Sequence, residues 1–257
     1  MDKLVLAIGD HFIEVSGDYS RLTLQNYDSF LTNAVQKVDL TLTLKEGYGH
    51  PFKDYEVTIT SAEDKIIFQR ADYLIRVAAD YRKAELFYYD GLALKHALMN
   101  LYSNFIVHHN WGVLLHSSSV MDGSKAHIFS GQSGAGKSTV AQMSQPRDLL
   151  SDEAAIIKIT DDEVKVYPSP FWSELCASHI GETTLSSIQL LHQSKINHKQ
   201  PLKKRQALMQ LIDKVFYWSY SPAQTTQVMT LLKQVVEQVP INELYFKKDP
   251  SFWELIS

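Results

Sequence analysis

The sequence predicts an α/β protein with a mixed, largely antiparallel sheet and a β-rich N-terminal half. Three observations lead to this fold class. Strand-like alternation dominates residues 1–90, a glycine-rich loop follows a strand-like segment near residue 131, and helical periodicity returns beyond residue 200. Of the 257 residues, 45% are hydrophobic and 21% charged, which excludes collagen-like and wholly disordered chains. We place a domain boundary between a β-rich part at 1–90 and a core with C-terminal helices at 91–257.

The N-terminal strands are predicted by period-two patterns. Every second residue of Val38–Leu44 is apolar, which places one row of side chains on a core. Further strand-like runs lie at Tyr55–Thr60, Lys65–Ala71, Tyr73–Ala78 and Lys83–Tyr89. Because only a few polar residues separate these runs, we expect an antiparallel meander. This sheet is expected to complete the core and to offer an edge to which an extended peptide could add.

The second part begins with a predicted helix. Apolar residues recur at helical spacing over Leu92–His109, and strand-like Gly112–Ser117 and Lys125–Ser130 then lead into the glycine-rich loop. A hairpin is predicted between Leu149–Ile159 and Glu163–Tyr167. The other predicted elements are helices at Lys137–Met143, Leu202–Trp218 and Pro222–Val239, the last capped by Ser221, and a strand at Ile241–Phe246.

Charge and cysteine content exclude several functional classes. Lys and Arg number 25 against 29 Asp and Glu, and the net charge of −4 argues against a dedicated nucleic-acid binder. The single cysteine, Cys176, excludes an internal disulfide and a cysteine-rich zinc site. Leu4–Ile8 is too short for a signal-peptide core, and no apolar run approaches the roughly 18 residues of a membrane span. We therefore expect a soluble, cytoplasmic protein with no nucleic-acid or membrane partner.

The segment Gly131–Ser138 matches the phosphate-loop pattern G-x-x-x-x-G-K-[ST] in full. Glycines let successive backbone N–H groups converge on phosphate oxygens, and a helix N-terminus adds a partial positive charge of about half a unit. We expect Lys137 to reach the β- and γ-phosphates of ATP and Ser138 to ligate Mg²⁺. The residues expected to contact the nucleotide are Gly131, Ser133, Gly134, Ala135, Gly136, Lys137, Ser138 and Thr139.

A magnesium–nucleotide site also needs a carboxylate, and the adjacent Asp152 and Glu153 are the best candidates. They follow the strand-like start at Leu149 and lie only 15 residues after Lys137. Most NTPases with this loop place the matching acid much later, so transporters and switch GTPases fit poorly. In a regular strand the two carboxylates would face opposite sides, which would let one hold the metal while the other approaches an acceptor.

Three segments together resemble a known family. Gly112–Ser117, with the sequence Gly-Val-Leu-Leu-His-Ser, the loop Gly131–Ser138 and the closely following Leu150–Glu153 look like the catalytic domain of bacterial HPr kinase/phosphorylase. That family shares its core with phosphoenolpyruvate carboxykinase. The resemblance covers residues 110–175. It implies a P-loop on a mixed, largely antiparallel sheet and ATP-dependent phosphorylation of a serine hydroxyl.

The resemblance also implies roles for individual residues. It puts Asp152 in the place of the catalytic base, Glu153 in that of the metal-side acid and His116 in that of the active-site histidine. From the loop motif, Lys137 is a further catalytic residue, and Ser138 is expected to hold magnesium with Glu153. The chain departs from HPr kinases at Thr139, where they usually carry an acid, and at Tyr167–Glu174, which stands where they show a Glu-Ile-Arg-Gly type segment. Its layout is closer to HPr-kinase-like proteins associated with ribosomal peptide natural products such as lasso peptides. Some of those proteins phosphorylate a serine of the precursor peptide.

One stretch is strongly basic. No acid lies between Glu182 and Asp213, and five cations stand there, namely Lys195, Lys199, Lys203, Lys204 and Arg205. This stretch either meets phosphates or an acidic substrate tail, or is a solvated surface. The histidines that show no metal-ligand spacing, and that we expect to be structural or exposed, are His108, His109, His179, His192 and His198.

Three functional hypotheses remain open from the sequence. The first is an ATP- and Mg²⁺-dependent kinase that phosphorylates a serine of a peptide or protein, such as a lasso precursor. The second is a phosphotransferase acting on a small-molecule hydroxyl or carboxylate, and the third is a non-catalytic nucleotide-binding module. The acceptor, the oligomeric state, including a homo-oligomer, and a reverse phosphorylase reaction are left open.

Overall fold

The computed structural model describes residues 3–19, 25–34, 37–173, 175 and 181–256. Cys176 and His179 lie outside this part of the chain. The chain divides into two compact units. The N-terminal unit comprises the chain up to His109 together with Tyr217–Gln224, and the second unit comprises Asn110–Phe216 and the chain from Thr225 onward. None of the described helices is long and apolar enough to cross a membrane.

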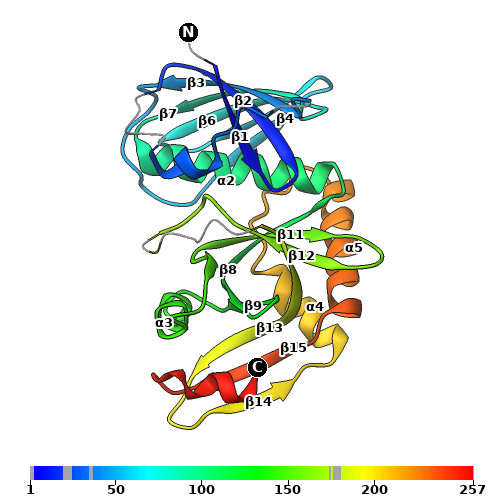
Figure 1. Ribbon diagram of the computed structural model, residues 1–257. Helices are drawn as coiled ribbons and strands as arrows, with labels where there is room; N and C mark the ends of the chain where they lie inside the picture. The colour runs from blue at the N-terminus through cyan, green and yellow to red at the C-terminus, as the bar shows by residue number, and fades with distance from the viewer. Residues whose placement is uncertain (1–2, 20–24, 35–36, 174, 176–180, 257) are drawn as a thin grey trace. The chain divides into compact units, whose positions relative to one another are not determined.

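The N-terminal unit contains a twisted sheet in which the predicted meander is confirmed (Figure 1). Its elements are β1 (Leu4–Ile8), β2 (His11–Gly17), η1 (Gln25–Phe30), β3 (Leu40–Glu46), β4 (Thr58–Ser61), β5 (Lys65–Gln69), β6 (Tyr73–Ala78) and β7 (Lys83–Tyr88). The strand order is β1-β2-β3-β7-β6-β5-β4, and β4 to β7 are antiparallel neighbours. However, β3 runs parallel to both β2 and β7, which was not predicted. Parallel neighbours need a long connection, and β3 has one on each side. A long segment joins it to β2, and the strands β4, β5 and β6 lie between it and β7 in the sequence.

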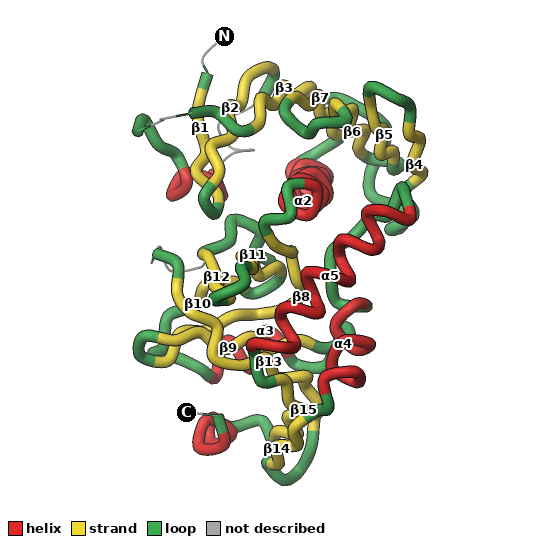
Figure 2. The backbone as a smooth tube through the Cα atoms, turned by 90° about the vertical axis from the view of Figure 1, so that its right-hand side faces the viewer, coloured by secondary structure: helices red, strands yellow, loops and turns green. Residues whose placement is uncertain are grey.

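Helix α2 (Gly91–His108) covers one face of this sheet (Figure 2). The carboxylate of Asp90 accepts a hydrogen bond from the Ala93 N–H at 2.9 Å and caps the helix. On the buried face, Asn100 donates to the hydroxyl of Tyr73 at 3.1 Å. The predicted boundary at residues 90 and 91 assigns this helix to the second part of the chain. Its apolar stripe instead packs in the N-terminal unit.

The second unit carries a mixed, largely antiparallel sheet, as predicted. Its strands are β8 (Gly112–Asp122), β9 (Lys125–Ser130), β10 (Leu149–Ser151), β11 (Ala154–Ile159), β12 (Val164–Tyr167), β13 (Thr183–Gln193), β14 (His198–Pro201) and β15 (Ile241–Phe246). The order is β10-β8-β11-β12-β13-β15-β14. Because β9 pairs with both β8 and β13, the strands β8, β11, β12, β13 and β9 close into a barrel. Strand β13, which is parallel to β9 and β15, was not predicted, since it is buried on both faces and shows little alternation.

Among the α-helices beyond residue 130, one ends well before its predicted last residue. Helix α3 (Lys137–Met143) has the predicted bounds, and α5 (Pro222–Gln238) has the hydroxyl of Ser221 accepting from the Gln224 N–H at 3.3 Å. In contrast, α4 (Lys204–Ile212) ends six residues before the predicted Trp218. The chain leaves α4 because Val215 bridges to Leu115 of β8. A final 3-10 helix, η2, spans Pro250–Leu255.

Candidate functional site

The phosphate loop connects β9 to α3, as the motif predicts. Gly134 and Gly136 have φ angles of 78° and 106°, in the left-handed region that favours glycine. A Cβ on Gly136 would also come within 2.7 Å of the Phe246 ring. That ring belongs to a buried cluster with Val140 of α3 and Phe252 of η2, so the loop lies on a packed hydrophobic support.

Lys137 folds back over the loop. Its Nζ donates to the backbone oxygens of Gly131 at 3.1 Å and Gln132 at 3.3 Å. Burial and the nearby ammonium of Lys214 lower the pKa of Lys137, and Glu153 opposes this shift. Within the described residues, no carboxylate lies at ion-pair distance from Lys137 or Lys214. Two cations near the loop are therefore available to an anionic ligand.

Lys214 was not predicted as a site residue. It lies two residues after the early end of α4, where its backbone oxygen accepts from the His116 N–H at 2.7 Å. Phe216 then returns to β8, with its N–H on the Leu114 oxygen and its ring 5.3 Å from the His116 ring. The sequence carried no signal for this placement, because the periodicity of α4 continued past Lys214.

His116 lies on β8, beside the loop. Burial, followed by the charges of Lys137 and Lys214, lowers the pKa of His116 to about 4. The ring is therefore neutral near pH 7. In this state one ring nitrogen can donate a hydrogen bond and the other can accept one, but the ring adds no positive charge to the two ammonium groups.

Asp152 and Glu153 do not lie in a regular strand. The predicted run Leu149–Ile159 is split into β10 and β11, with the two acids at the bend between them. The bend arises because β10 and β11 pair with different parts of β8, with an irregular register at Ser151. The regular strand on which the expectation of opposite faces depends is therefore absent at these two residues, and both residues line the same cavity.

Asp152 is 2% exposed, and its carboxylate is held by the loop that follows β12. Oδ1 accepts from the Ser173 N–H at 2.9 Å. Oδ2 accepts from the Ser173 hydroxyl and from the Leu175 N–H, both at 2.9 Å. Sequence analysis does not assign a role to Ser173, which lies in the segment Tyr167–Glu174 that departs from the HPr kinase pattern. Its hydroxyl occupies the place on Asp152 where an acceptor hydroxyl was expected.

Two cavities meet at the phosphate loop. The smaller one, of about 320 Å³, brings together the predicted His116, Lys137, Ser138, Asp152 and Glu153. Its other lining residues are Ser133, Gly134, Gly136, Thr139, Ser173 and Gln193. The larger one, of about 520 Å³, is lined by Gly131–Ala135, Leu190–Gln193, Gln210 and Lys214. The loop therefore forms part of the wall of both cavities, and the predicted site residues are distributed between them.

The metal residues expected from the sequence provide oxygen ligands only. Ser138 supplies a hydroxyl and Glu153 a carboxylate to the smaller cavity. The described residues contain no group of three or more His, Cys, Asp or Glu side chains that could hold a metal by themselves. Hard oxygen donors in small number fit Mg²⁺, which keeps several waters and shares its ligands with substrate phosphates. The donor set is thus compatible with a nucleotide-bound magnesium ion.

Other candidate residues lie elsewhere. The basic stretch Lys195–Arg205 includes the exposed edge strand β14, and Lys204 pairs with Glu237 of α5. None of its side chains lines either loop cavity. His192, expected to be structural or exposed, lines the larger cavity and stacks on Tyr245 with ring centroids 4.7 Å apart.

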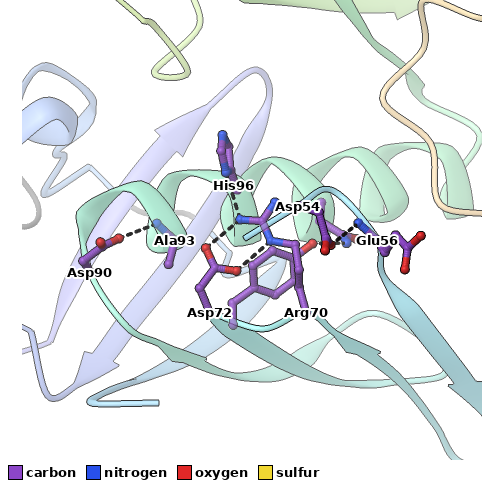
Figure 3. A network of polar contacts seen from close by, with 9 residues as sticks. Asp54, Glu56, Arg70, Asp72, Asp90, Ala93 and His96 are labelled. Carbon is purple, nitrogen blue, oxygen red and sulfur yellow. Dashed lines mark hydrogen bonds and ion pairs between the residues drawn. The ribbon is translucent and has the colours of Figure 1, made fainter. Parts of the chain in front are cut away.

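A second polar cluster, in the N-terminal unit, has the opposite character (Figure 3). The guanidinium of Arg70 donates to both oxygens of Asp72 at 2.7 and 2.8 Å and contacts Nδ1 of His96 at 2.9 Å. The rings of Tyr73 and Phe52 lie 4.4 and 4.9 Å from it. The buried charges of Arg70 and Asp72 are paired with each other, which is typical of a structural network.

No protein-family model matches the chain, and no curated protein is significantly similar to it. The resemblance to HPr kinase/phosphorylase therefore rests on the motif residues alone.

Proposed function

We propose that this chain is an ATP-dependent kinase that transfers the γ-phosphoryl group to a serine hydroxyl of a peptide or protein. The observation that carries the proposal is the meeting of a complete phosphate loop with Asp152, Glu153 and His116 around one cavity. These residues come from β8, from α3 and from the bend before β11.

The phosphates of ATP would be bound by the loop N–H groups and by Lys137 and Lys214. An anion that enters the loop would replace the two backbone oxygens that Lys137 now contacts. The larger cavity, with His192 stacked on Tyr245 and Gln210 at its wall, would take the nucleoside. Loose transition states of phosphoryl transfer spread charge over the phosphoryl oxygens, and two nearby ammonium groups stabilise that charge.

Asp152 would orient the acceptor hydroxyl and take its proton. In a loose transition state the attacking oxygen needs little activation, so a fixed and correctly aimed carboxylate contributes mainly through position. The hydrogen bonds from Ser173 and Leu175 hold Asp152 in one orientation. Ser173 is itself exposed, so the acceptor end of the cavity is open to solvent. This openness favours a serine on a polypeptide over a small metabolite.

Magnesium would be held by Ser138 and Glu153 together with the phosphates, and it would neutralise charge on the β- and γ-phosphate oxygens. The neutral ring of His116 would serve as a hydrogen-bond partner beside the two lysines. These assignments fit an HPr-kinase-like enzyme on a phosphoenolpyruvate-carboxykinase-related core. A serine of a ribosomal precursor peptide, such as a lasso precursor, is the proposed acceptor.

One observation favours a second candidate function. The three hydrogen bonds to the Asp152 carboxylate described above come from its own chain, which would suit a purely structural aspartate in a non-catalytic nucleotide-binding module. Asp152→Asn separates the two functions. In a kinase, transfer should fall by roughly 10²- to 10⁴-fold while ATP binding survives.

The experiment uses the full chain with Mg-ATP and candidate precursor peptides encoded next to its gene, and phosphopeptides are detected by mass spectrometry. Glu153→Gln provides a second variant in case Asp152→Asn disturbs the loop at Ser173. Asp162→Asn, in the exposed turn before β12, is the matched control and should keep full transfer. Failure of the wild-type chain to bind Mg-ATP, or full transfer in both site variants, would overturn the proposal.

A further inference from the structure

The environment of Ser173 differs from that of four buried serines on the neighbouring strands β8, β9 and β10. Those serines are fully buried and donate their hydroxyl hydrogens to backbone oxygens; they are Ser117, Ser118, Ser130 and Ser151. Ser173 is exposed, lines the smaller cavity and donates to the carboxylate of Asp152 at 2.9 Å. Its hydroxyl hydrogen is thus directed at the proposed base, and the oxygen lone pairs remain available to an electrophile.

The same cavity holds the groups that would bind the electrophile. Lys137 and Ser138 line it together with Ser173, and both belong to the phosphate loop. A γ-phosphoryl group bound there would share a cavity of about 320 Å³ with the Ser173 hydroxyl. The backbone N–H of Ser173 also binds Asp152, so this serine is held to the base at two points.

We propose that Ser173 is a phosphoryl acceptor within the chain, which the protein phosphorylates itself in the presence of Mg-ATP. This inference rests on the proposed kinase function and names a modification site for it. The Ser173 oxygen forms a bond to the γ-phosphorus, and the bond between that phosphorus and the β–γ bridging oxygen breaks. ADP leaves with the electron pair, and the hydroxyl proton passes to Asp152.

Phosphorylation changes the contacts of this loop. The phosphoserine no longer has the hydroxyl hydrogen that binds Oδ2 of Asp152, and its negative charge faces a carboxylate. The phosphorylated side chain of Ser173 is therefore expected to move away from the Asp152 carboxylate. An external serine can then bind in the position that Ser173 occupied.

The test incubates the full wild-type chain with Mg-ATP and no peptide, and maps phosphate by mass spectrometry after digestion. Ser173→Ala removes the hydroxyl but keeps both backbone donors to Asp152, so it should fold and remain unphosphorylated. Ser173→Thr restores a hydroxyl and should regain the modification. Ser251 is the internal control, because its hydroxyl also donates to an aspartate, Asp249, although it lines neither loop cavity.

Support requires phosphate on Ser173, none on Ser251, and a rate of Ser173 phosphorylation in Lys137→Ala that is lower by roughly 10²-fold or more. The rate should be first order and independent of protein concentration, as expected for transfer within one chain. A wild-type chain that phosphorylates a serine peptide but stays unmodified at Ser173 would overturn this inference and leave the kinase proposal intact. A chain that binds no Mg-ATP would overturn both, and a wild-type rate of Ser173 phosphorylation in Lys137→Ala would overturn self-phosphorylation.

Discussion

Arg70 in the N-terminal unit is buried and Lys137 in the second unit is half-buried, but of these two cations only Arg70 has a carboxylate of the described residues within ion-pair distance. Arg70 is paired with Asp72 and contacts His96 (Figure 3). The rings of Tyr73 and Phe52 lie 4.4 and 4.9 Å from its guanidinium. Lys137 contacts two backbone oxygens, and Lys214 lies close enough to lower its pKa.

The difference separates a structural charge cluster from one suited to ligand binding. In a buried ion pair the two opposite charges compensate each other, so removing one partner is expected to destabilise the fold. Lys137 and Lys214 have no ion pair with a carboxylate in the described part of the chain, so an anionic ligand can compensate their charges. Stability should therefore depend on the first cluster and nucleotide binding on the second. The following predictions test this contrast.

The largest effect is expected for Asp72→Ala. The substitution leaves Arg70 buried without its carboxylate, which should lower the free energy of unfolding by about 3–5 kcal/mol. Denaturant unfolding of the full chain measures the loss. Glu85→Ala, in the half-exposed Lys45–Glu85 pair of the same sheet, is the control and should cost at most about 1 kcal/mol. Equal losses in the two variants would remove the structural role assigned to Arg70.

The next effect is expected for Lys137→Ala. Loss of a charged phosphate contact that acts in the transition state should reduce transfer by roughly 10²- to 10³-fold and weaken ATP binding. The unfolding free energy should change by less than about 1 kcal/mol, since no ion pair is broken. Lys125→Ala, at the exposed start of β9, is the control for both measurements. Wild-type transfer in Lys137→Ala would end the kinase proposal.

A smaller effect is expected for Lys214→Gln. Removing the second cation should raise the KM for ATP roughly tenfold, because a hydrogen bond to a charged group contributes about 1.5–3 kcal/mol. The control is Lys203→Gln, which removes one positive charge from the basic stretch outside the loop cavities. Steady-state kinetics at several salt concentrations measure the effect. Identical kinetics in both variants would exclude Lys214 from the site.

The two histidines near these clusters should respond differently to ligand. The pKa of His96 is lowered to about 4 by burial and then by Arg70, and that of His116 is lowered to about 4 by burial and then by Lys137 and Lys214. Both rings bind protons more readily when unfolded. Stability is therefore complete above the ordinary value of 6.5 and falls as the pH drops towards 4.

A bound triphosphate offsets the charges of Lys137 and Lys214. We expect a non-hydrolysable ATP analogue to raise the pKa of His116 by about one unit and to leave that of His96 unchanged. NMR titration of the histidine rings measures both values in one sample. A shift confined to His96 would reverse the roles of the two clusters.

The smallest effect is expected for the basic stretch. Lys203, Lys204 and Arg205 are exposed and line neither loop cavity, and Lys204 is paired with Glu237. Changing all three to Ser should alter kcat and the KM for ATP by less than twofold, as expected for charges on a solvated surface. A clear rise in the KM for a peptide substrate would instead assign this stretch to recognition of an acidic segment.

Local patterns in the sequence predicted a large part of this structure. The alternation of Val38–Leu44, the periodicity of Leu92–His109 and the loop motif Gly131–Ser138 each depend on neighbours within a few residues. The bounds of β6, β9, α3 and β15 agree with prediction. The sequence also determined the phosphate loop and the acid pair of the candidate site, because each is a contiguous segment, but it did not single out Lys214 or Ser173.

Tertiary structure decided how these groups meet. The bend at Asp152 and Glu153 exists because β10 and β11 pair with different parts of β8. Lys214 reaches the phosphate loop because the chain after α4 pairs with β8. Ser173 reaches the site because Asp152 binds the loop that follows β12. Such contacts depend on barrel closure between strands far apart in sequence, and local periodicity carries no information about those partners.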